Sequence, residues 1–450
     1  VRCKNFFALG FMYYVYSRPL EPTLKFFEQK WGKRLPDLAQ ANSKVLKAGF
    51  NLGDTMETAR NRYQVSKAPV QSGVYRKISG NEAMVYGLVA ASKLANRELL
   101  YSGYPITPAS PVLEGLSQLK NFGVKSVQAE DEIAAMGVAL GASFAGDLTV
   151  CATSGPGMCL KSEFIGLASI TELPLIICNV QRGGPSTGLP TKTEQSDLLQ
   201  ALFSRHGDCP IPVLAAHSPS DCFDCAIEAA RIALTYMTPV ILLSDLYVAN
   251  GSEPWLIPNV SDLPAIENSF ASTEEEYVIY RRDPKTLARS QAIPGQAGLE
   301  HRIGGLEKGE DGGVSYDPDN HEEMSRLRAQ KIAGISKSLD PIEIHGDKEG
   351  DLLVIGWGGT YGAISSAVSN LREEGFSISN IHLRHLNPFP DDLGEIMSRF
   401  KKVIVPELNL GQLNMLLRAK YLVDVISYGK LQGKPFKVSE LHEKFLEYLR

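Results

Sequence analysis

The stretch Leu99-Leu100-Tyr101-Ser102-Gly103-Tyr104-Pro105-Ile106-Thr107-Pro108 predicts a short buried strand followed by a polar loop. Two later strand patterns end in the same way, in Thr153-Ser154-Gly155-Pro156-Gly157 and in Gln181-Arg182-Gly183-Gly184-Pro185-Ser186-Thr187-Gly188. The carboxyl ends of parallel strands share one edge of a sheet, and open α/β sheets bind their ligands at that edge. The three loops therefore predict one shared binding site.

Helical and strand patterns alternate from Gly80 to Leu246, which predicts a mostly parallel, doubly wound sheet covered by helices on both faces. The predicted strands are Leu99–Tyr104, Val124–Gln128, Leu148–Thr153, Leu175–Val180, Ile211–Ala215 and Val240–Leu246. The predicted helices are Asn81–Ala95, one opened by Ser110 and Pro111, Asp131–Ala145, Lys161–Thr171, Asp197–Phe203 and Pro219–Tyr236.

Two further regions flank a segment without periodicity. Residues 1–66 read as basic amphipathic helices broken by prolines, and a second α/β unit begins at Asp351. Between them, from about Asn250 to Asp340, a polar stretch is too long for an ordinary connection, so we expect it to wrap between domains with one helix near Glu322 to Ser336. The expected domains are 1–66, 78–250, 251–345 and 346–450. In the last domain we expect strands Leu352–Ile355, Ser379–Leu383 and Val403–Val405 and helices Tyr361–Glu374, closed by Gly375, and Asp391–Phe400.

Glycines at the start of this second α/β unit invite a dinucleotide-binding interpretation. The spacing excludes it, because G-x-G-x-x-G starting at Gly356 would place its last glycine at Tyr361. We expect no nicotinamide site there.

Composition limits the partners. The chain has 450 residues and a net charge of −5, so it shows no electrostatic footprint for nucleic acid or for an anionic membrane. No apolar run is long enough to span a bilayer, and the opening residues lack the pattern of a signal peptide. We expect a cytoplasmic protein. Because the chain begins without Met and inside a helical pattern, we also expect it to lack its original amino end.

The seven cysteines are scattered, which argues for a reducing compartment and against a disulfide framework. Cys222 and Cys225 form the single C-x-x-C, in the first turns of a helix for which Ser218 is the expected N-cap. A helix start favours a thiolate, but one C-x-x-C cannot ligate a four-iron cluster. We expect two half-buried helix cysteines, and the sequence does not decide whether they have a redox role.

Taken together, the three loops resemble those of the thiamine-diphosphate-dependent 2-oxoacid:ferredoxin oxidoreductases, in the subunit that carries the aminopyrimidine-binding domain. The run from Glu132 to Gly141 is similar to the E-x-A-A-x-x-x-A-x-G pattern that follows the cofactor glutamate of thiamine enzymes. By resemblance, Glu132 protonates the aminopyrimidine ring and so activates the cofactor. A first-turn acid that only satisfies the helix dipole is the alternative, and Glu130 is an alternative register.

The resemblance assigns further site residues. Arg182, in a loop stiffened by prolines, matches the arginine that binds the substrate carboxylate, and a guanidinium suits that task because it can hold a carboxylate bidentately. Thr107, kept extended by the following proline, matches the threonine that contacts substrate. A solvated loop arginine and an ordinary turn threonine are the alternatives. The residues expected to line the cofactor are Tyr104, Pro105, Ile106, Glu132, Ser154 and Gly155.

Half of a thiamine site is missing from the chain. The Gly-Asp-Gly signature that holds the Mg²⁺ of the cofactor diphosphate does not occur, nor does a ferredoxin-type cysteine run. We therefore expect no metal on this chain. The resemblance implies that a β subunit carries the diphosphate, the Mg²⁺ and a [4Fe-4S] cluster, in a heterodimer or an α2β2 heterotetramer.

The function implied by the resemblance is the oxidative decarboxylation of 2-oxoglutarate with coenzyme A to succinyl-CoA and CO2, with reduction of ferredoxin. Residues 1–66 resemble the end of the family's γ domain fused ahead of the α domains, and the carboxyl-terminal domain resembles that of transketolase. This fusion favours 2-oxoglutarate, while pyruvate or a branched 2-oxoacid as substrate, a non-catalytic paralogue, and another thiamine enzyme class remain alternatives.

Overall fold

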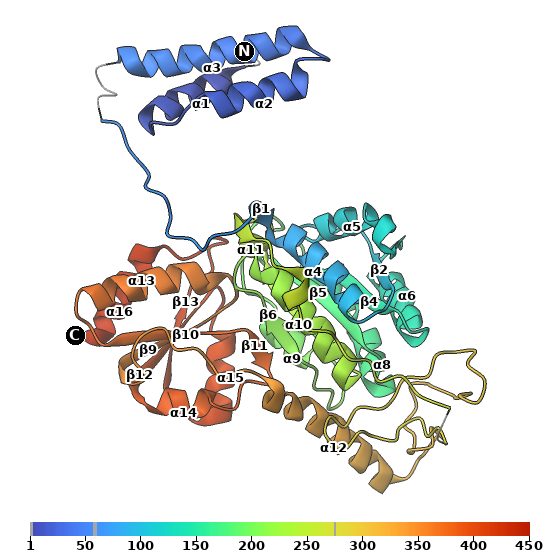
Figure 1. Ribbon diagram of the computed structural model, residues 1–450. Coiled ribbons are helices and arrows are strands. Elements are labelled where there is room, and N and C mark those ends of the chain that lie inside the picture. Colours follow the sequence, from blue (N-terminus) through green and yellow to red (C-terminus); the bar gives the residue numbers. More distant parts are fainter. Residues whose placement is uncertain (1–2, 57–60, 274–275) are drawn as a thin grey trace. The chain divides into compact units, whose positions relative to one another are not determined.

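The computed structural model describes residues 3–56, 61–273 and 276–450. The chain divides into two compact units, with the boundary after Gly73, and each is described by itself (Figure 1). The first unit holds α1 (Lys4–Val15), α2 (Glu21–Trp31) and α3 (Pro36–Thr55). A Cβ on Gly10 would lie 2.0 Å from the carbonyl oxygen of Leu46, and one on Gly49 would lie 1.9 Å from that of Phe7. The absence of side chains at these glycines therefore lets α1 and α3 touch backbone to backbone.

The second unit is built on a seven-stranded sheet in the order β11-β6-β7-β5-β4-β2-β3, in which all pairs are parallel except the edge pair β11–β6. Its strands are β2 (Leu99–Gly103), β3 (Val124–Gln128), β4 (Leu148–Thr153), β5 (Leu175–Gln181), β6 (Val213–Ala215), β7 (Pro239–Asp245) and β11 (His385–Asn387). Its helices are α4 (Gly80–Leu94), α5 (Ser110–Ser117), α6 (Glu132–Phe144), α7 (Gly155–Leu160), α8 (Ser162–Thr171), α9 (Leu198–Phe203), α10 (Asp221–Tyr236) and α11 (Leu246–Asn250).

Side chains of the central strands alternate between two cores, as a sheet covered on both faces requires. Val150 and Ala152 of β4 pack with α4, α5 and α10, whereas Cys151 packs with α6 and α8 on the other face. The predicted doubly wound parallel sheet is therefore confirmed.

A smaller parallel sheet follows, in the order β10-β9-β12-β13. It comprises β9 (Gly350–Trp357), β10 (Ile378–Leu383), β12 (Phe400–Glu407) and β13 (Val425–Gly429), with α13 (Tyr361–Glu373), α14 (Leu393–Ser398), α15 (Gln412–Tyr421) and α16 (Val438–Leu449). Gly375 ends the first of these helices with a φ of 93°, as predicted. One continuous hydrophobic core joins this four-stranded sheet to the seven-stranded sheet. It includes Ile177 of the larger sheet and Ile355 of the smaller one.

Several local expectations were wrong. Residues 155–160, expected to be loop, form α7, because Pro156 stands in the first turn, where a helix tolerates the missing N–H. Strands β1 (Tyr75–Ser79) and β8 (Ser252–Leu256) pair across the sequence in a ladder that no local pattern announces. Helix α10 begins two residues later than expected, with Ser220 and not Ser218 as its N-cap.

Cys222 and Cys225 in α10 are fully buried, not half-buried. Burial raises the pKa of both thiols well above the ordinary value, and the nearby Asp221 carboxylate raises them further. Desolvation therefore outweighs the helix start, and neither cysteine is a thiolate at neutral pH.

The wrapping segment is ordered by charge. Its helix α12 (Pro318–Gly334) continues into a 3-10 turn, Ile335–Ser338, close to the predicted helix. Lys331 from α12 and Arg282 from the preceding loop both bind the buried carboxylate of Glu172, at 2.5 and 2.6 Å, just after α8. Arg289 donates to the carbonyl of Thr171, at the same helix end. Cations at a helix C-terminus are favourable, so a polar segment gains a fixed anchor on the sheet.

Within the described parts of the chain, none of the helices has the length and apolar character that crossing a bilayer requires.

Candidate active site

The three loops singled out in the sequence lie side by side, because β5, β4 and β2 are neighbours and run parallel. Tyr104 follows β2, and its hydroxyl donates a hydrogen bond to the carboxylate of Glu132 at the start of α6. Tyr104 is half-buried, and burial together with the Glu132 carboxylate raises the pKa of its phenol. The phenol therefore stays protonated and remains a donor to this carboxylate across the physiological range.

Glu132 is fixed by the capping of its own helix. The Asp131 side chain accepts a hydrogen bond from the backbone N–H of Ala134 at 2.8 Å, so α6 begins with Glu132 as its first residue. Glu132 is half-buried and points to Tyr104, whereas Glu130 precedes the helix and is exposed. This geometry favours Glu132 over the alternative register.

The start of α7 packs tightly against this pair. A Cβ on Gly157 would lie 2.1 Å from the hydroxyl oxygen of Thr153, 2.9 Å from the Cγ of Glu132 and 3.0 Å from the hydroxyl oxygen of Tyr104. Any side chain at position 157 would therefore displace Thr153 and press against the side chains of Glu132 and Tyr104.

Sequence reasoning missed Lys161, which lies beneath the pair. Its side chain is fully buried, and its Nζ donates to the backbone carbonyl of Glu132 at 2.9 Å and lies 5.9 Å from the centre of the Tyr104 ring. The hydrogen bonds described for Lys161 include none to a carboxylate. A lysine at a predicted helix start looks like a solvated charge, and only the turn from α7 into α8 brings it inside.

Arg182 and Thr107 also meet. One guanidinium nitrogen of Arg182 donates to the carbonyl of Thr107 at 2.5 Å, while the Nε is buried without a hydrogen-bond partner among the described residues. The exposed Thr107 thus contributes its carbonyl to this contact, and not its hydroxyl. Next to it, Pro105 is exposed, and Ile106 packs partly buried against the core.

Ser154 and Gly155 follow β4, the strand that lies between β2, which leads to Tyr104, and β5, which leads to Arg182. Ser154 is buried, and its hydroxyl oxygen has no hydrogen-bond partner among the described residues. A Cβ on Gly155 would lie 3.1 Å from both carboxylate oxygens of Asp197, so this carboxylate packs closely against Gly155. Burial raises the pKa of Asp197, although bonds from Ser196 and Asn179 and the charge of Arg182 oppose the rise.

The polar groups present suit one part of thiamine diphosphate. A half-buried carboxylate held by a tyrosine is what a ring nitrogen requires, and the unpartnered Ser154 hydroxyl and Arg182 Nε offer further contacts. Among the described residues no cluster of three or more His, Cys, Asp or Glu side chains is arranged to hold a metal ion. The donor set therefore fits the aminopyrimidine ring and a carboxylate.

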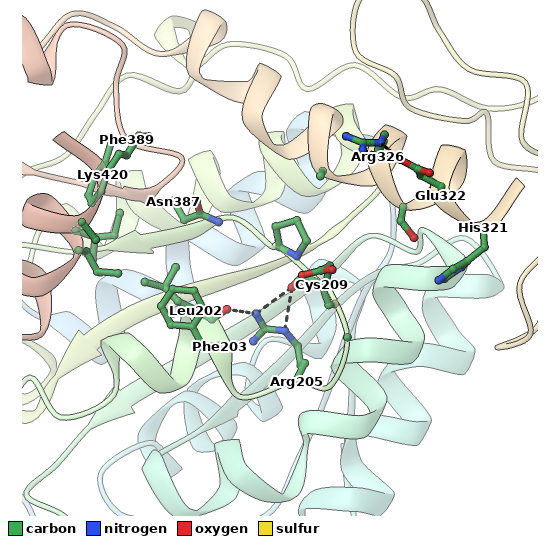
Figure 2. Close-up of a pocket in the computed structure, with 18 residues that line it drawn as sticks. Leu202, Phe203, Arg205, Cys209, His321, Glu322, Arg326, Asn387, Phe389 and Lys420 are labelled. Atoms are coloured by element: carbon green, nitrogen blue, oxygen red, sulfur yellow. Dashed lines mark hydrogen bonds and ion pairs between the residues drawn. The ribbon is translucent and has the colours of Figure 1, made fainter. Parts of the chain in front are cut away.

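The largest of the described cavities lies elsewhere. It has a volume of about 960 Å³ and is lined by the end of α9 and the loop that follows it, by α12, by β11 with the nearby Phe389, and by α15 (Figure 2). Arg205 in its wall donates to the carbonyls of Ala201, Leu202 and Cys209, so its donors are engaged in holding the end of α9 (Figure 2). None of the residues that line this cavity belongs to the three loops singled out in the sequence.

Comparison with known proteins follows the same division of the chain. Residues 92–313 match the family model described as pyruvate flavodoxin/ferredoxin oxidoreductase, thiamine diP-bdg, and residues 350–441 match pyruvate:ferredoxin oxidoreductase core domain II. The chain is 53% identical to the 2-oxoglutarate oxidoreductase subunit KorA of Mycobacterium tuberculosis, over 98% of this chain and 67% of that protein.

Two further relatives support this similarity. The 2-oxoglutarate synthase subunit KorA of Archaeoglobus fulgidus is 37% identical over 74% of this chain and 88% of its own length. Among solved structures, a 2-oxoglutarate:ferredoxin oxidoreductase from Magnetococcus marinus, with 2-oxoglutarate, coenzyme A and succinyl-CoA bound, superposes with a TM-score of 0.93 at 33% identity. That superposition covers 100% of this chain and 78% of the other chain.

Proposed function

The chain belongs to the 2-oxoacid:ferredoxin oxidoreductase family, and we propose that within it the chain is the α subunit of a 2-oxoglutarate:ferredoxin oxidoreductase. The reaction is the oxidative decarboxylation of 2-oxoglutarate with coenzyme A to succinyl-CoA and CO2, with two electrons passed to ferredoxin. The names of the relatives and the ligands bound in the Magnetococcus marinus structure support this substrate. The observation in this chain that carries the proposal is the bond from Tyr104 to Glu132, beside Arg182, at one edge of the parallel sheet.

Each site residue has a distinct task in this reaction. Bound thiamine diphosphate supplies the nucleophilic carbon and the electron sink that decarboxylation of a 2-oxoacid needs. Glu132 would hold the aminopyrimidine ring and keep a proton at the ring nitrogen, with Tyr104 fixing the orientation of its carboxyl group. Arg182 would bind the substrate carboxylate. Its hydrogen bond to the carbonyl of Thr107 would keep the guanidinium at the edge of the sheet where Glu132 lies.

The rest of the site has to come from a partner. The sequence lacks a Gly-Asp-Gly signature, and its cysteines are scattered through the fold as free thiols. We assign the diphosphate, the Mg²⁺ and the [4Fe-4S] cluster to a β subunit that pairs with this chain. We also assign the three helices of the first unit to the end of a γ-type domain.

Substrate choice is tested on the complex purified with its β subunit. Reduction of a low-potential acceptor is measured with 2-oxoglutarate, pyruvate and a branched 2-oxoacid, each with and without coenzyme A. We expect coenzyme-A-dependent reduction with the highest kcat/KM for 2-oxoglutarate. A preference for pyruvate would move the chain to another member of the family, and no activity with any 2-oxoacid would favour the non-catalytic paralogue.

A further inference from the structure

The loop that carries Arg182 returns to the sheet through residues 193–197, which we call the return segment. The loop is closed by a hydrogen bond from the backbone N–H of Gly183 to the carbonyl of Lys192 at 3.0 Å. The Ser196 hydroxyl then donates to the carbonyl of Arg182 itself at 2.8 Å, and the backbone N–H of Asp197 donates to the side chain of Gln181 at 3.0 Å. The return segment therefore fixes the backbone of Arg182 through hydrogen bonds to Arg182 and to its neighbour Gln181.

Gln195, in the middle of the return segment, is fully buried and bonds entirely to the carboxyl-terminal sheet. Its side-chain Nε2 donates to the carbonyl of Trp357 at 2.7 Å, and its Oε1 accepts from the backbone N–H of Leu408 at 2.8 Å. Its backbone N–H donates to the carbonyl of Leu408 at 3.1 Å, and its carbonyl accepts from the amide of Asn409 at 2.9 Å. Both ends of the side chain and both backbone groups are thus fixed by one domain.

Gln195 sits where an open α/β sheet usually binds a ligand. Trp357 ends β9 and Leu408 follows β12, and the chain passes from β9 to β10 on one side and then to β12 on the other side. The crevice at the carboxyl ends of two such strands is the topological switch point of the sheet. In this chain a glutamine from another part of the polypeptide fills it.

Two glycines of the run that resembled a dinucleotide motif make room for this contact. Gly358 has a φ of +54°, and a Cβ there would lie 3.0 Å from the Nε2 of Gln195. A Cβ on Gly359 would lie 2.4 Å from the carboxylate of Asp245 at the end of β7, which also accepts a bond from the Thr193 hydroxyl at 2.8 Å. These glycines therefore admit protein side chains, which accounts for a spacing that suits no dinucleotide.

We propose that Gln195 is a positioning residue, through which the carboxyl-terminal domain sets the place of Arg182 and hence of the substrate carboxylate. This inference rests on the proposed function of Arg182. A loop with glycines at 183, 184 and 188 has many conformations to lose, and Gln195 anchors it to a rigid sheet before substrate arrives. A group that is held in place before substrate arrives loses less conformational entropy on binding, so loss of the anchor should weaken substrate binding.

The test compares Gln195→Leu with Arg384→Met in the purified complex. Arg384 joins the same two regions through its bond to Asp221, but it belongs to the far edge of the large sheet. We expect Gln195→Leu to raise the KM for 2-oxoglutarate about 10-fold, which is about 1.4 kcal/mol, with kcat changed far less. Arg384→Met should lower the thermal midpoint without this KM change. An unchanged KM in Gln195→Leu, or an equal rise in Arg384→Met, would overturn the proposal.

Milder variants guard against misfolding of Gln195→Leu. Ser196→Ala removes only the bond to the carbonyl of Arg182, so it should raise KM in the same direction but less. Gln195→Glu can donate to the carbonyl of Trp357 only when protonated, so its KM should approach the wild-type value as the pH is lowered. A KM for Gln195→Glu that tracks wild type at all pH values would contradict the role assigned to Nε2.

A double-mutant cycle shows whether Gln195 acts through Arg182. In an Arg182→Ala background, Gln195→Leu should have little further effect on KM, because the group that it positions is gone. Fully multiplicative effects would overturn the proposal. Amide hydrogen exchange of residues 183–188 in the full chain gives a readout without activity: it should quicken in Gln195→Leu and not in Arg384→Met. If the wild-type complex proves inactive with 2-oxoglutarate, the proposed function fails. The hydrogen-exchange result still decides whether Gln195 fixes the loop that carries Arg182.

Discussion

At the scale of single residues, the candidate site is an acid whose surroundings hold it in one position. Tyr104 holds the carboxylate of Glu132, Lys161 holds its backbone carbonyl, and the bare Cα of Gly157 leaves it room. Two regions of the sequence, the loop after β2 and α7 with its C-cap Lys161, therefore converge on Glu132 at the start of α6. Such support is what a proton-transfer group needs, since its geometry must be set before the reaction.

Replacing Glu132 by glutamine tests its role in cofactor activation. Glutamine keeps the size and one acceptor but cannot relay a proton, so we expect kcat of the complex to fall by about 10² to 10⁴-fold. The direct measurement is exchange of the C2 proton of the cofactor in the loaded complex. Glu130→Gln is the matched control, because Glu130 is exposed and precedes the helix. Slow exchange in Glu130→Gln with normal exchange in Glu132→Gln would reverse the assignment.

Replacing Lys161 by methionine tests the buried cation. Methionine fills a similar volume and removes a charge for which the described hydrogen bonds include no carboxylate partner, so folding stability should change by less than about 1.5 kcal/mol. The carbonyl of Glu132 loses its donor, however, and the first turn of α6 gains freedom. We expect C2-proton exchange to slow by roughly 10-fold while the cofactor is still bound, as measured by cofactor content. Wild-type exchange would show that the lysine has a purely packing role.

At the scale of elements, the local sequence pattern predicted the strands of the large sheet closely. The strands at Val124–Gln128 and Leu148–Thr153 have the predicted bounds, and β2 and β5 differ from prediction by one residue at their ends. Alternating apolar runs and helix starts identify these elements before any tertiary contact is known.

The features that the sequence did not predict depend on contacts between residues that are distant in sequence. Strand β11 joins the large sheet from the other α/β region, pairing His385 with Leu214, and β1 forms only against β8. Lys161 and Gln195 are polar residues whose burial follows from tertiary packing alone. Hydrophobic periodicity cannot report such positions, because a polar residue in a pattern is read as solvent-facing.

The anchor of the wrapping segment should make that segment sensitive to acid. Burial by itself raises the pKa of Glu172, but the charges of Lys331 and Arg282 outweigh it and hold the pKa at about 2. The folded carboxyl thus binds its proton more weakly than the unfolded one. Its stabilising contribution is full above the ordinary value near 4.5 and is lost as the pH falls from there toward 2. Thermal midpoints measured between pH 7 and pH 2 should therefore fall in this window.

Substitution at Glu172 separates this contribution from general acid denaturation. Glu172→Gln leaves buried cations unpaired, so we expect a loss of about 3 to 5 kcal/mol at neutral pH and a shallower fall below pH 4.5. Glu98→Gln is the control, because Glu98 forms a solvent-exposed pair with Lys125, and such pairs contribute little to stability. Parallel acid profiles for wild type and Glu172→Gln would show that this carboxylate does not control the acid response.

At the scale of the whole molecule, the large sheet presents its site at an open edge, whereas the largest described cavity lies in another part of the molecule. The carboxyl-terminal sheet has its own switch-point crevice filled by Gln195, so it acts on the site as a support. Sequence reasoning predicted that the three loops share one edge, and the strand order confirms this, because the loops follow three neighbouring parallel strands. It could not find the support, because the contact joins residues more than 160 positions apart.

The isolated full chain should therefore hold neither iron nor tightly bound thiamine diphosphate. Burial raises the pKa of Cys151, Cys178, Cys222 and Cys225, so these thiols are poor metal ligands, and the described residues contain no metal-binding cluster. Without a metal-bound diphosphate, the cofactor would contact only Glu132 and its neighbours. We expect no iron by elemental analysis and a dissociation constant at least about 100-fold weaker than in the complex, a difference of about 2.7 kcal/mol. Calorimetric titration of the chain with and without its partner measures this difference. A chain that copurifies with a four-iron spectrum, or binds the cofactor as tightly as the complex does, would show that the site is not divided between two subunits.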